Sequence, residues 1–85
     1  MPLYMDIHKG KQGNAVTPEA IAEVHKKDLQ TQGKYGVKYE KYFLDPSSGT
    51  IFCLVEAPNK EAAIRVHKEA HGLGADEIFE VIERS

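Results

Sequence analysis

The most chemically informative residues of this chain are two histidines that share the same short sequence context. Both His25 and His67 are the centre of a Val-His-Lys triplet. On a helical wheel, at about 100° per residue, each ring falls on the apolar face of its segment. A polar ring on a buried face needs a hydrogen-bond partner or a ligand. The repeated triplet therefore indicates either two structural core histidines or a metal site.

A second histidine spacing is suited to chelation. His67 and His71 are four residues apart, so on a helix both rings project from one face. Imidazole suits nickel, zinc or copper, and additional carboxylate or water ligands favour six-coordinate nickel or cobalt. The alternative is that the inward histidines only form hydrogen bonds to Asp28, a tyrosine or the backbone. The candidate metal ligands are, in order, His67, His71, His25, His8 and Asp28, with Glu69 and Cys53 as weaker helpers.

Other features could carry catalysis, but each has a simpler interpretation. Pro2 could act as a secondary-amine base, as in tautomerases, although proline is also tolerated at the start of a strand. Cys53 lies in an apolar run without an activating base, which favours packing over nucleophilic chemistry. The loop that contains Lys9 and Lys11 could bind an anion through backbone amides, but a plain surface loop is the simpler interpretation. We therefore do not expect an enzyme.

Composition narrows the classes of partner. The 85 residues include 11 basic and 13 acidic side chains, and the net charge of −2 does not favour nucleic acid or anionic membranes. A single cysteine excludes an intrachain disulfide, and no apolar run approaches about 18 residues. The N-terminus lacks the pattern of a signal peptide. These features predict a cytoplasmic protein without nucleic-acid or membrane partners.

The elements that must position these residues can be read from periodicity and turn signals. Strict alternation predicts strands, whereas Thr17-Pro18 and Pro58-Asn59 are typical of helix starts. Gly33 is expected to stop the first helix, and Gly72 the second. The expected order is strand 3–8, helix 18–32, strand 37–44, strand 50–56, helix 58–72 and strand 77–82.

This order predicts a single α+β domain over residues 1–85 with the ferredoxin-like βαββαβ fold. The expected antiparallel sheet has strand order 4-1-3-2, with both helices on one face. We expect Leu3, Met5 and Ile7 to face the helices, which would turn His8 to the open face.

The open face of the sheet predicts self-association. The run 51–55 is apolar on both faces, which implies that both faces are covered. Phe52 and Leu54, with Tyr4 and Tyr42, would form the apolar open face, and a second copy of the same sheet would cover it as a two-fold homodimer. Such a dimer could instead enclose a cavity for a small organic ligand or substrate, lined by Tyr4, Phe52 and Tyr42. A bare interaction module is a third alternative.

Several segments carry a family resemblance: MPLYMDIH at 1–8, KYGVKY at 34–39, FCLVEAP at 52–58 and HKEAHG at 67–72. Together they resemble a family of small bacterial ferredoxin-like domains of unknown function whose characterised type is a nickel-binding protein. The resemblance implies a homodimer that binds nickel for sequestration or detoxification, with nickel at the dimer surface in the known type. It transfers no ligand residues. We therefore predict a dimeric nickel-binding protein that serves metal homeostasis without catalysis of its own, with zinc or another divalent transition metal as the alternative ion.

Overall fold

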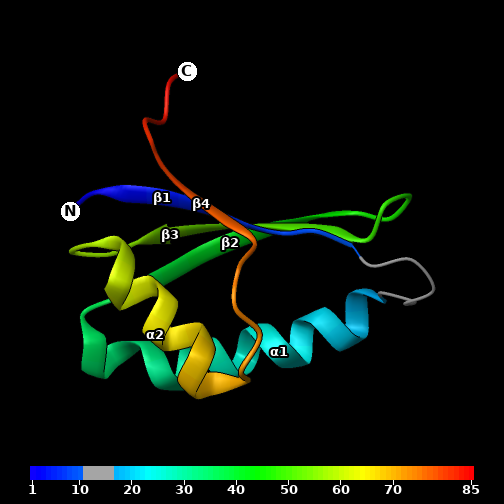
Figure 1. Cartoon of the computed structure of the whole chain (residues 1–85), viewed down its shortest axis with the longest axis horizontal. Helices are drawn as coiled ribbons and strands as arrows, with labels where there is room; N and C mark the ends of the chain where they lie inside the picture. Colours follow the sequence, from blue (N-terminus) through cyan, green and yellow to red (C-terminus); the bar gives the residue numbers. More distant parts are fainter. Residues whose placement is uncertain (11–16) are drawn as a thin grey trace.

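The fold is a four-stranded antiparallel sheet that carries two helices on one face (Figure 1). The computed structural model describes residues 1–10 and 17–85. Its elements are β1 (Leu3–His8), α1 (Pro18–Thr31), the 3₁₀ helix η1 (Gln32–Tyr35), β2 (Lys38–Asp45), β3 (Thr50–Glu56), α2 (Lys60–Ala70) and β4 (Glu77–Val81). The strand order β2-β3-β1-β4 is the predicted order read from the opposite edge, so the ferredoxin-like topology is confirmed. Of the predicted anion-binding loop at 9–13, residues 11–13 lie outside the described residues.

Local side-chain chemistry starts both helices. The Thr17 hydroxyl accepts a hydrogen bond from the Ala20 N–H at 3.1 Å, and the Asn59 amide oxygen accepts one from the Ala62 N–H at 2.8 Å. Each bond satisfies a backbone donor that the first helical turn leaves free. Among the described residues, no helix is long and apolar enough to cross a membrane.

The end of the first helix differs from the prediction at Gly33. Helix α1 ends at Thr31, and the chain continues through Gly33 as the 3₁₀ turn η1. The actual stop is Gly36, whose φ of 65° is the left-handed conformation that glycine adopts without steric cost.

The prediction of which face of β1 is buried was wrong. Tyr4 and Asp6 face the helices and are 5% and 1% exposed, whereas Leu3 and Met5 lie on the open face. The cross-strand partners agree, because Asp6 pairs with the buried Cys53 of β3. A period of two shows which residues share a face but not which face is covered. The correction moves His8 to the helix side of the sheet.

A β-bulge in β2 adds a second unpredicted feature on the helix side. The register shifts between Tyr39 and Lys41, which leaves Glu40 as the extra residue. As a result Tyr39 and Tyr42 both face the helices, although one is at an odd and the other at an even position. Tyr4 and Tyr42 are therefore not part of the open face, and this part of the prediction was also wrong.

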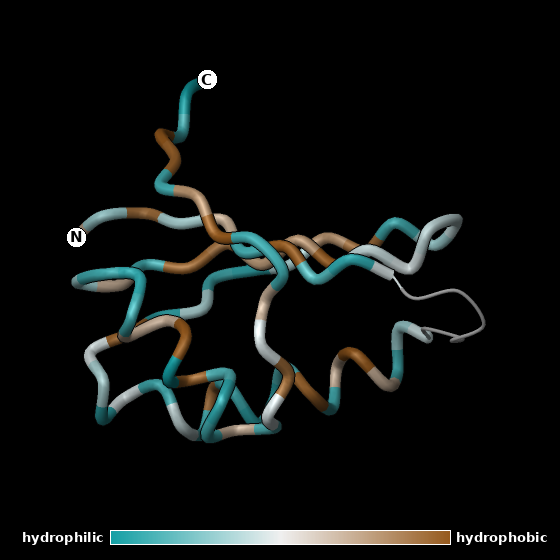
Figure 2. Tube along the Cα trace, in the orientation of Figure 1, coloured by the Kyte–Doolittle hydropathy of each residue, from teal (hydrophilic) through white to brown (hydrophobic). Residues whose placement is uncertain are grey.

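The open face of the sheet is apolar, as predicted from Phe52 and Leu54. Phe43 and Phe79 lie beside them and remain 52% and 48% exposed. Apolar residues run along the sheet in Figure 2, and the chain after β4 leaves on the side opposite the helices. The strand registers place eight apolar residues on this face: Leu3, Met5, Ile7, Phe43, Phe52, Leu54, Phe79 and Val81.

Candidate metal centre

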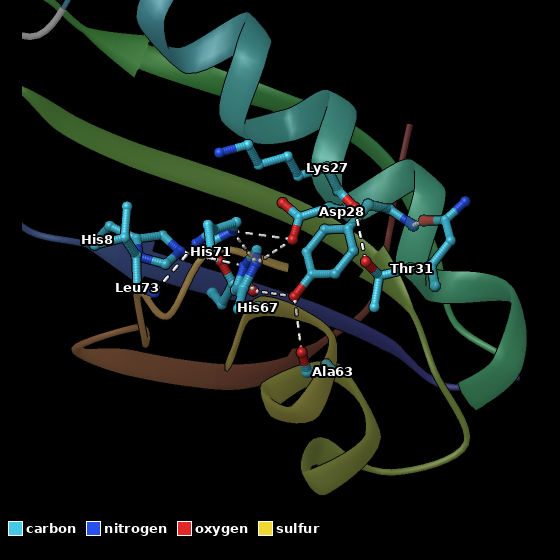
Figure 3. Close-up of polar contacts among 11 residues, drawn as sticks. His8, Lys27, Asp28, Thr31, Ala63, His67, His71 and Leu73 are labelled. Carbon is cyan, nitrogen blue, oxygen red and sulfur yellow. Dashed lines mark hydrogen bonds and ion pairs between the residues drawn. The ribbon is translucent and has the colours of Figure 1, made fainter. Parts of the chain in front are cut away.

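His67 is the centre of a buried polar cluster between the sheet and the helices (Figure 3). Its side chain extends from α2 near the C-terminal end of that helix, and the residue is 2% exposed. Both ring nitrogens have carboxylate partners. Nδ1 lies 2.8 Å from Asp28 Oδ1, and Nε2 lies 3.0 Å from Asp6 Oδ2. One imidazole therefore bridges β1 and α1.

Each nitrogen of His67 belongs to a different potential metal-binding group. Its Nε2 lies 3.3 Å from His8 Nε2, in a group that also includes Asp6 and Cys53. Its Nδ1 lies 3.2 Å from His71 Nε2, in a group completed by Asp28. Within each group the ligand atoms all lie within 4.8 Å of one another.

Secondary structure explains why these side chains meet. Asp6 and His8 alternate on β1 and so point to the same face, and Cys53 is the cross-strand partner of Asp6. His67 and His71 are separated by one helical turn. The cluster thus draws on the centre of the sheet and the end of a helix, which are well-anchored parts of the fold.

Hydrogen bonds fix the position of the Asp6 carboxylate. The Tyr39 hydroxyl donates to Asp6 Oδ2 at 2.8 Å and also lies 3.2 Å from the carbonyl oxygen of Ala63. On the other oxygen, Asp6 Oδ1 lies 3.1 Å from His8 Nε2. Burial, together with the nearby Asp6 charge, raises the pKa of Tyr39, so its hydroxyl remains a proton donor.

Removing the Tyr39 hydroxyl should destabilise the protein. In a Tyr39→Phe variant the buried Asp6 loses a charge-assisted hydrogen bond, and we expect the free energy of unfolding to fall by about 1.5–3 kcal/mol. Urea denaturation measures this change. A matched Tyr35→Phe variant, which removes the hydroxyl bonded to the exposed Glu69, should stay within about 0.5 kcal/mol of wild type. Equal effects of the two substitutions would contradict a special role for the buried bond.

A backbone donor fixes the tautomer of His71. The Leu73 N–H donates to His71 Nδ1 at 3.1 Å, so the ring proton of neutral His71 resides on Nε2. That Nε2–H donates to Asp28 Oδ1 at 3.0 Å. Asp28 also accepts from His67 Nδ1, which leaves His67 Nε2 directed at Asp6 and His8.

Ion pairing controls the protonation of the cluster. Burial by itself would lower the pKa of His67, but hydrogen bonds to Asp28 and Asp6 outweigh it and raise the pKa to about 9. Burial likewise opposes ionisation of Asp6, yet the bonds from His67 and His8 hold its pKa well below the usual range. Near neutral pH, His67 is therefore an imidazolium between two carboxylates, and a metal ion would have to replace its proton.

The spacing of the Nε2 group fits a transition-metal ion. Cis ligands of a six-coordinate ion with bonds of about 2.1 Å lie about 3.0 Å apart. Asp6 Oδ1 lies 3.1 Å from His8 Nε2 and Asp6 Oδ2 lies 3.0 Å from His67 Nε2, so the carboxylate turns a different oxygen to each ring. The two histidine nitrogens lie 3.3 Å apart. Two imidazoles and a carboxylate are donors that suit nickel, zinc and iron. Burial raises the pKa of the Cys53 thiol, so this fourth donor stays protonated without a metal.

A cavity of about 440 Å³ opens above the cluster on the helix side of the sheet. It lies within one chain, whereas the alternative prediction placed a cavity between two sheets. Its polar floor comprises His8, His67, His71, Asp28 and Cys53. Its walls include Ile21, Val24, His25, Tyr42, Ile51 and Leu73, and Lys9, Gly10 and Asp76 lie at the end of β1.

The structure brings together four of the five predicted ligands: His67, His71, His8 and Asp28. The fifth, His25, lies against Tyr42 with ring centroids 4.8 Å apart, so it faces the cavity without joining either group. Glu69 instead accepts a hydrogen bond from the Tyr35 hydroxyl at 2.6 Å and pairs with Lys34.

Sequence reasoning missed Asp6 and Tyr39. Asp6 is two residues from His8, so the two must share a face, and this alternation was the available signal. The signal is ambiguous because a strand with apolar residues at odd positions can turn either face to the helices.

Comparisons with known proteins agree with this fold. The family model described as "Nickel responsive protein SCO4226-like" matches residues 4–81. A solved structure, titled as the crystal structure analysis of SCO4226 from Streptomyces coelicolor A3(2), is 38% identical in sequence and superposes with a TM-score of 0.87. The match covers 98% of this chain and 99% of that one. No curated protein matches the sequence at a significant level.

Proposed function

The chain belongs to the family of SCO4226-like nickel responsive proteins, and from this premise we propose that it binds Ni²⁺ through His67, His8 and Asp6. The observation that carries the proposal is the buried grouping of these three side chains: the two histidine nitrogens lie 3.3 Å apart, and each lies 3.0–3.1 Å from one oxygen of the Asp6 carboxylate. Two buried carboxylates around the shared His67 ring also favour a cation at this place.

The hydrogen-bond network supports this group over the one around His71. In the proposed site, His67 binds the metal through Nε2 and donates its Nδ1–H to Asp28, which is the carboxylate–histidine–metal arrangement common in metalloproteins. His71 would have to bind through Nε2, but the Leu73 N–H occupies its Nδ1, so coordination would require an imidazolate or the loss of that bond. We therefore assign His71 and Asp28 to positioning His67.

Paired histidine variants test the assignment. We expect tag-free wild-type protein to bind one nickel ion per chain in calorimetric titrations at pH 8. His8→Ala should abolish binding, whereas His71→Ala should weaken it by about 10–100-fold, as loss of an outer partner usually does. The opposite order would assign the metal to the Asp28 group. Unchanged binding in both variants would place nickel elsewhere, such as the dimer surface, and would overturn the proposed site.

The same titrations address metal identity. Nitrogen and oxygen donors suit nickel, whereas Cys53 adds a softer donor that suits zinc or copper. In competition titrations, the Cys53→Ser variant should lose more affinity for zinc than for nickel, relative to wild type. A larger loss for nickel would place the thiolate among the nickel ligands.

We propose further that the protein is a homodimer formed through its open sheet face. The support is the exposed apolar surface around Phe43 and Phe79, together with an 82% exposed Ile82 on the segment that leaves this face. Met5→Glu, placed between Leu54 and Phe79, should give a monomer in sedimentation velocity. Leu29→Glu is the control, because it changes a 46% exposed residue on α1 and should leave the dimer intact. Monomeric wild type would contradict the proposal.

The cellular role that fits such a site is cytoplasmic sequestration of nickel without catalysis. A buried metal centre of two imidazoles and a carboxylate, reached through a cavity, can hold the ion away from other ligands. Cells that lack the protein should tolerate less nickel, and His8→Ala should fail to restore tolerance. If His8→Ala restored nickel tolerance fully, the role in tolerance would not depend on this site.

A further inference from the structure

The cavity above the cluster is larger than hydration of a metal ion requires. Water occupies about 30 Å³ per molecule in the liquid, and the cavity measures about 440 Å³, within the range of small-molecule sites. Resting on the proposed nickel site, we infer that this cavity takes a small α-amino or α-hydroxy acid with a short apolar side chain, which binds the nickel ion as an external chelating ligand.

The placement of the three proposed ligands would leave a bound ion open on the side of the cavity. His8 and His67 line the cavity, whereas the 1% exposed Asp6 lies behind them and is not part of its wall. Three protein donors fill half of a six-coordinate sphere. An ion held by these residues would therefore be accessible from the cavity, where two neighbouring positions would suit the two donors of a five-membered chelate ring.

The apolar walls of the cavity suit an apolar group at the end of the ligand that does not chelate the ion. Ile21 and Val24 from α1 face Ile51 from β3 across the space, and Tyr42 and Leu73 extend the apolar surface. A ligand with one chelating end and one short apolar end matches this division.

Charge favours a carboxylate at the chelating end. Asp6 supplies one negative charge to a doubly charged ion, and Asp28 is held by two histidines on the far nitrogen of His67. A ligand carboxylate would supply the second negative charge at the ion. At the cavity edge the Lys9 ammonium pairs with Glu77, and Asp76 accepts a hydrogen bond from the Lys9 backbone N–H.

Three isosteric probes test the inference on nickel-loaded wild-type protein: L-valine, 2-hydroxyisovalerate and isovalerate. Native mass spectrometry should detect a ternary complex of protein, nickel and ligand in a 1:1:1 ratio for at least one of the first two. Whichever of the two binds identifies the amino or the hydroxy source. Isovalerate has no α donor and should give no complex. Nickel stripped from the protein without a ternary species, or equal binding of isovalerate, would overturn the inference.

A matched pair of variants localises the ligand. Val24→Phe fills the cavity from α1 and should lower the affinity for the chelating acid by about tenfold or more, with nickel binding unchanged. Ala22→Phe adds the same group on the exposed side of α1 and should change neither affinity. Nickel affinity is measured for every protein in the series. If the wild-type protein does not bind nickel, the proposed function is refuted. Normal nickel binding without any ternary complex would refute only the inference about the ligand.

Discussion

Replacing His67 by alanine is expected to eliminate nickel binding and to lower the free energy of unfolding by about 3–5 kcal/mol, even without metal. The reason is that His67 is the shared partner of Asp6 and Asp28, and removing it takes from two buried carboxylates the imidazolium that they share. Chemical denaturation of the metal-free protein and nickel titration measure the two effects.

Two further variants sharpen this test. Lys68→Ala changes the adjacent, exposed residue and should leave stability within about 0.5 kcal/mol of wild type. His67→Gln retains an amide that can donate to a carboxylate, so it should be more stable than the alanine variant but equally unable to bind nickel. A His67→Ala protein of wild-type stability would show that the buried ion pairs contribute nothing to folding.

The stability of the metal-free protein should decrease as pH rises from about 6.5 to about 9. His67 has a folded-state pKa of about 9, above its unfolded value of about 6.5, so its contribution is fully present below pH 6.5 and is lost through pH 9. The difference between these pKa values corresponds to about 3 kcal/mol. Thermal unfolding across this range measures it, and the slope should disappear in His67→Gln.

The nickel affinity should show the opposite pH dependence and increase as pH rises. The ion must displace the His67 proton, so affinity should rise by about tenfold per pH unit up to about pH 9. Calorimetry in buffers of different ionisation enthalpy should detect one proton released per nickel at pH 8. If the nickel affinity instead levels off near pH 6.5, which is about the pKa of an unperturbed histidine, His67 is not the ligand.

Most of the fold could be predicted because each element carries its own local signals. The alternation in β1 and the caps at Thr17 and Asn59 are sequence-local, and the order of elements then limits the topology. The covered face of β1 could not be predicted, because it depends on whether a strand buries its apolar residues against helices or against another sheet. Only tertiary packing decides that question.

The candidate site was predictable in its three histidines and in Asp28, but not in Asp6 and Tyr39. The spacing of His67 and His71 is visible in a helical pattern, and both rings are in the cluster. Asp6 and His8 meet them only because β1 turns its polar side inward. The tautomer of His71 depends on the Leu73 backbone N–H, which leaves no mark on sequence composition.

The two sides of β1 also separate two kinds of evolutionary change. Asp6 and His8 belong to the polar cluster, whereas Met5 and Ile7 belong to the open sheet face. Substitutions at odd positions can therefore alter the open sheet face, and with it the proposed dimer, while the cluster stays intact, and substitutions at even positions can do the reverse. An insertion or deletion of one residue inside β1 has no such freedom. It would exchange the two sides and destroy both properties in a single event.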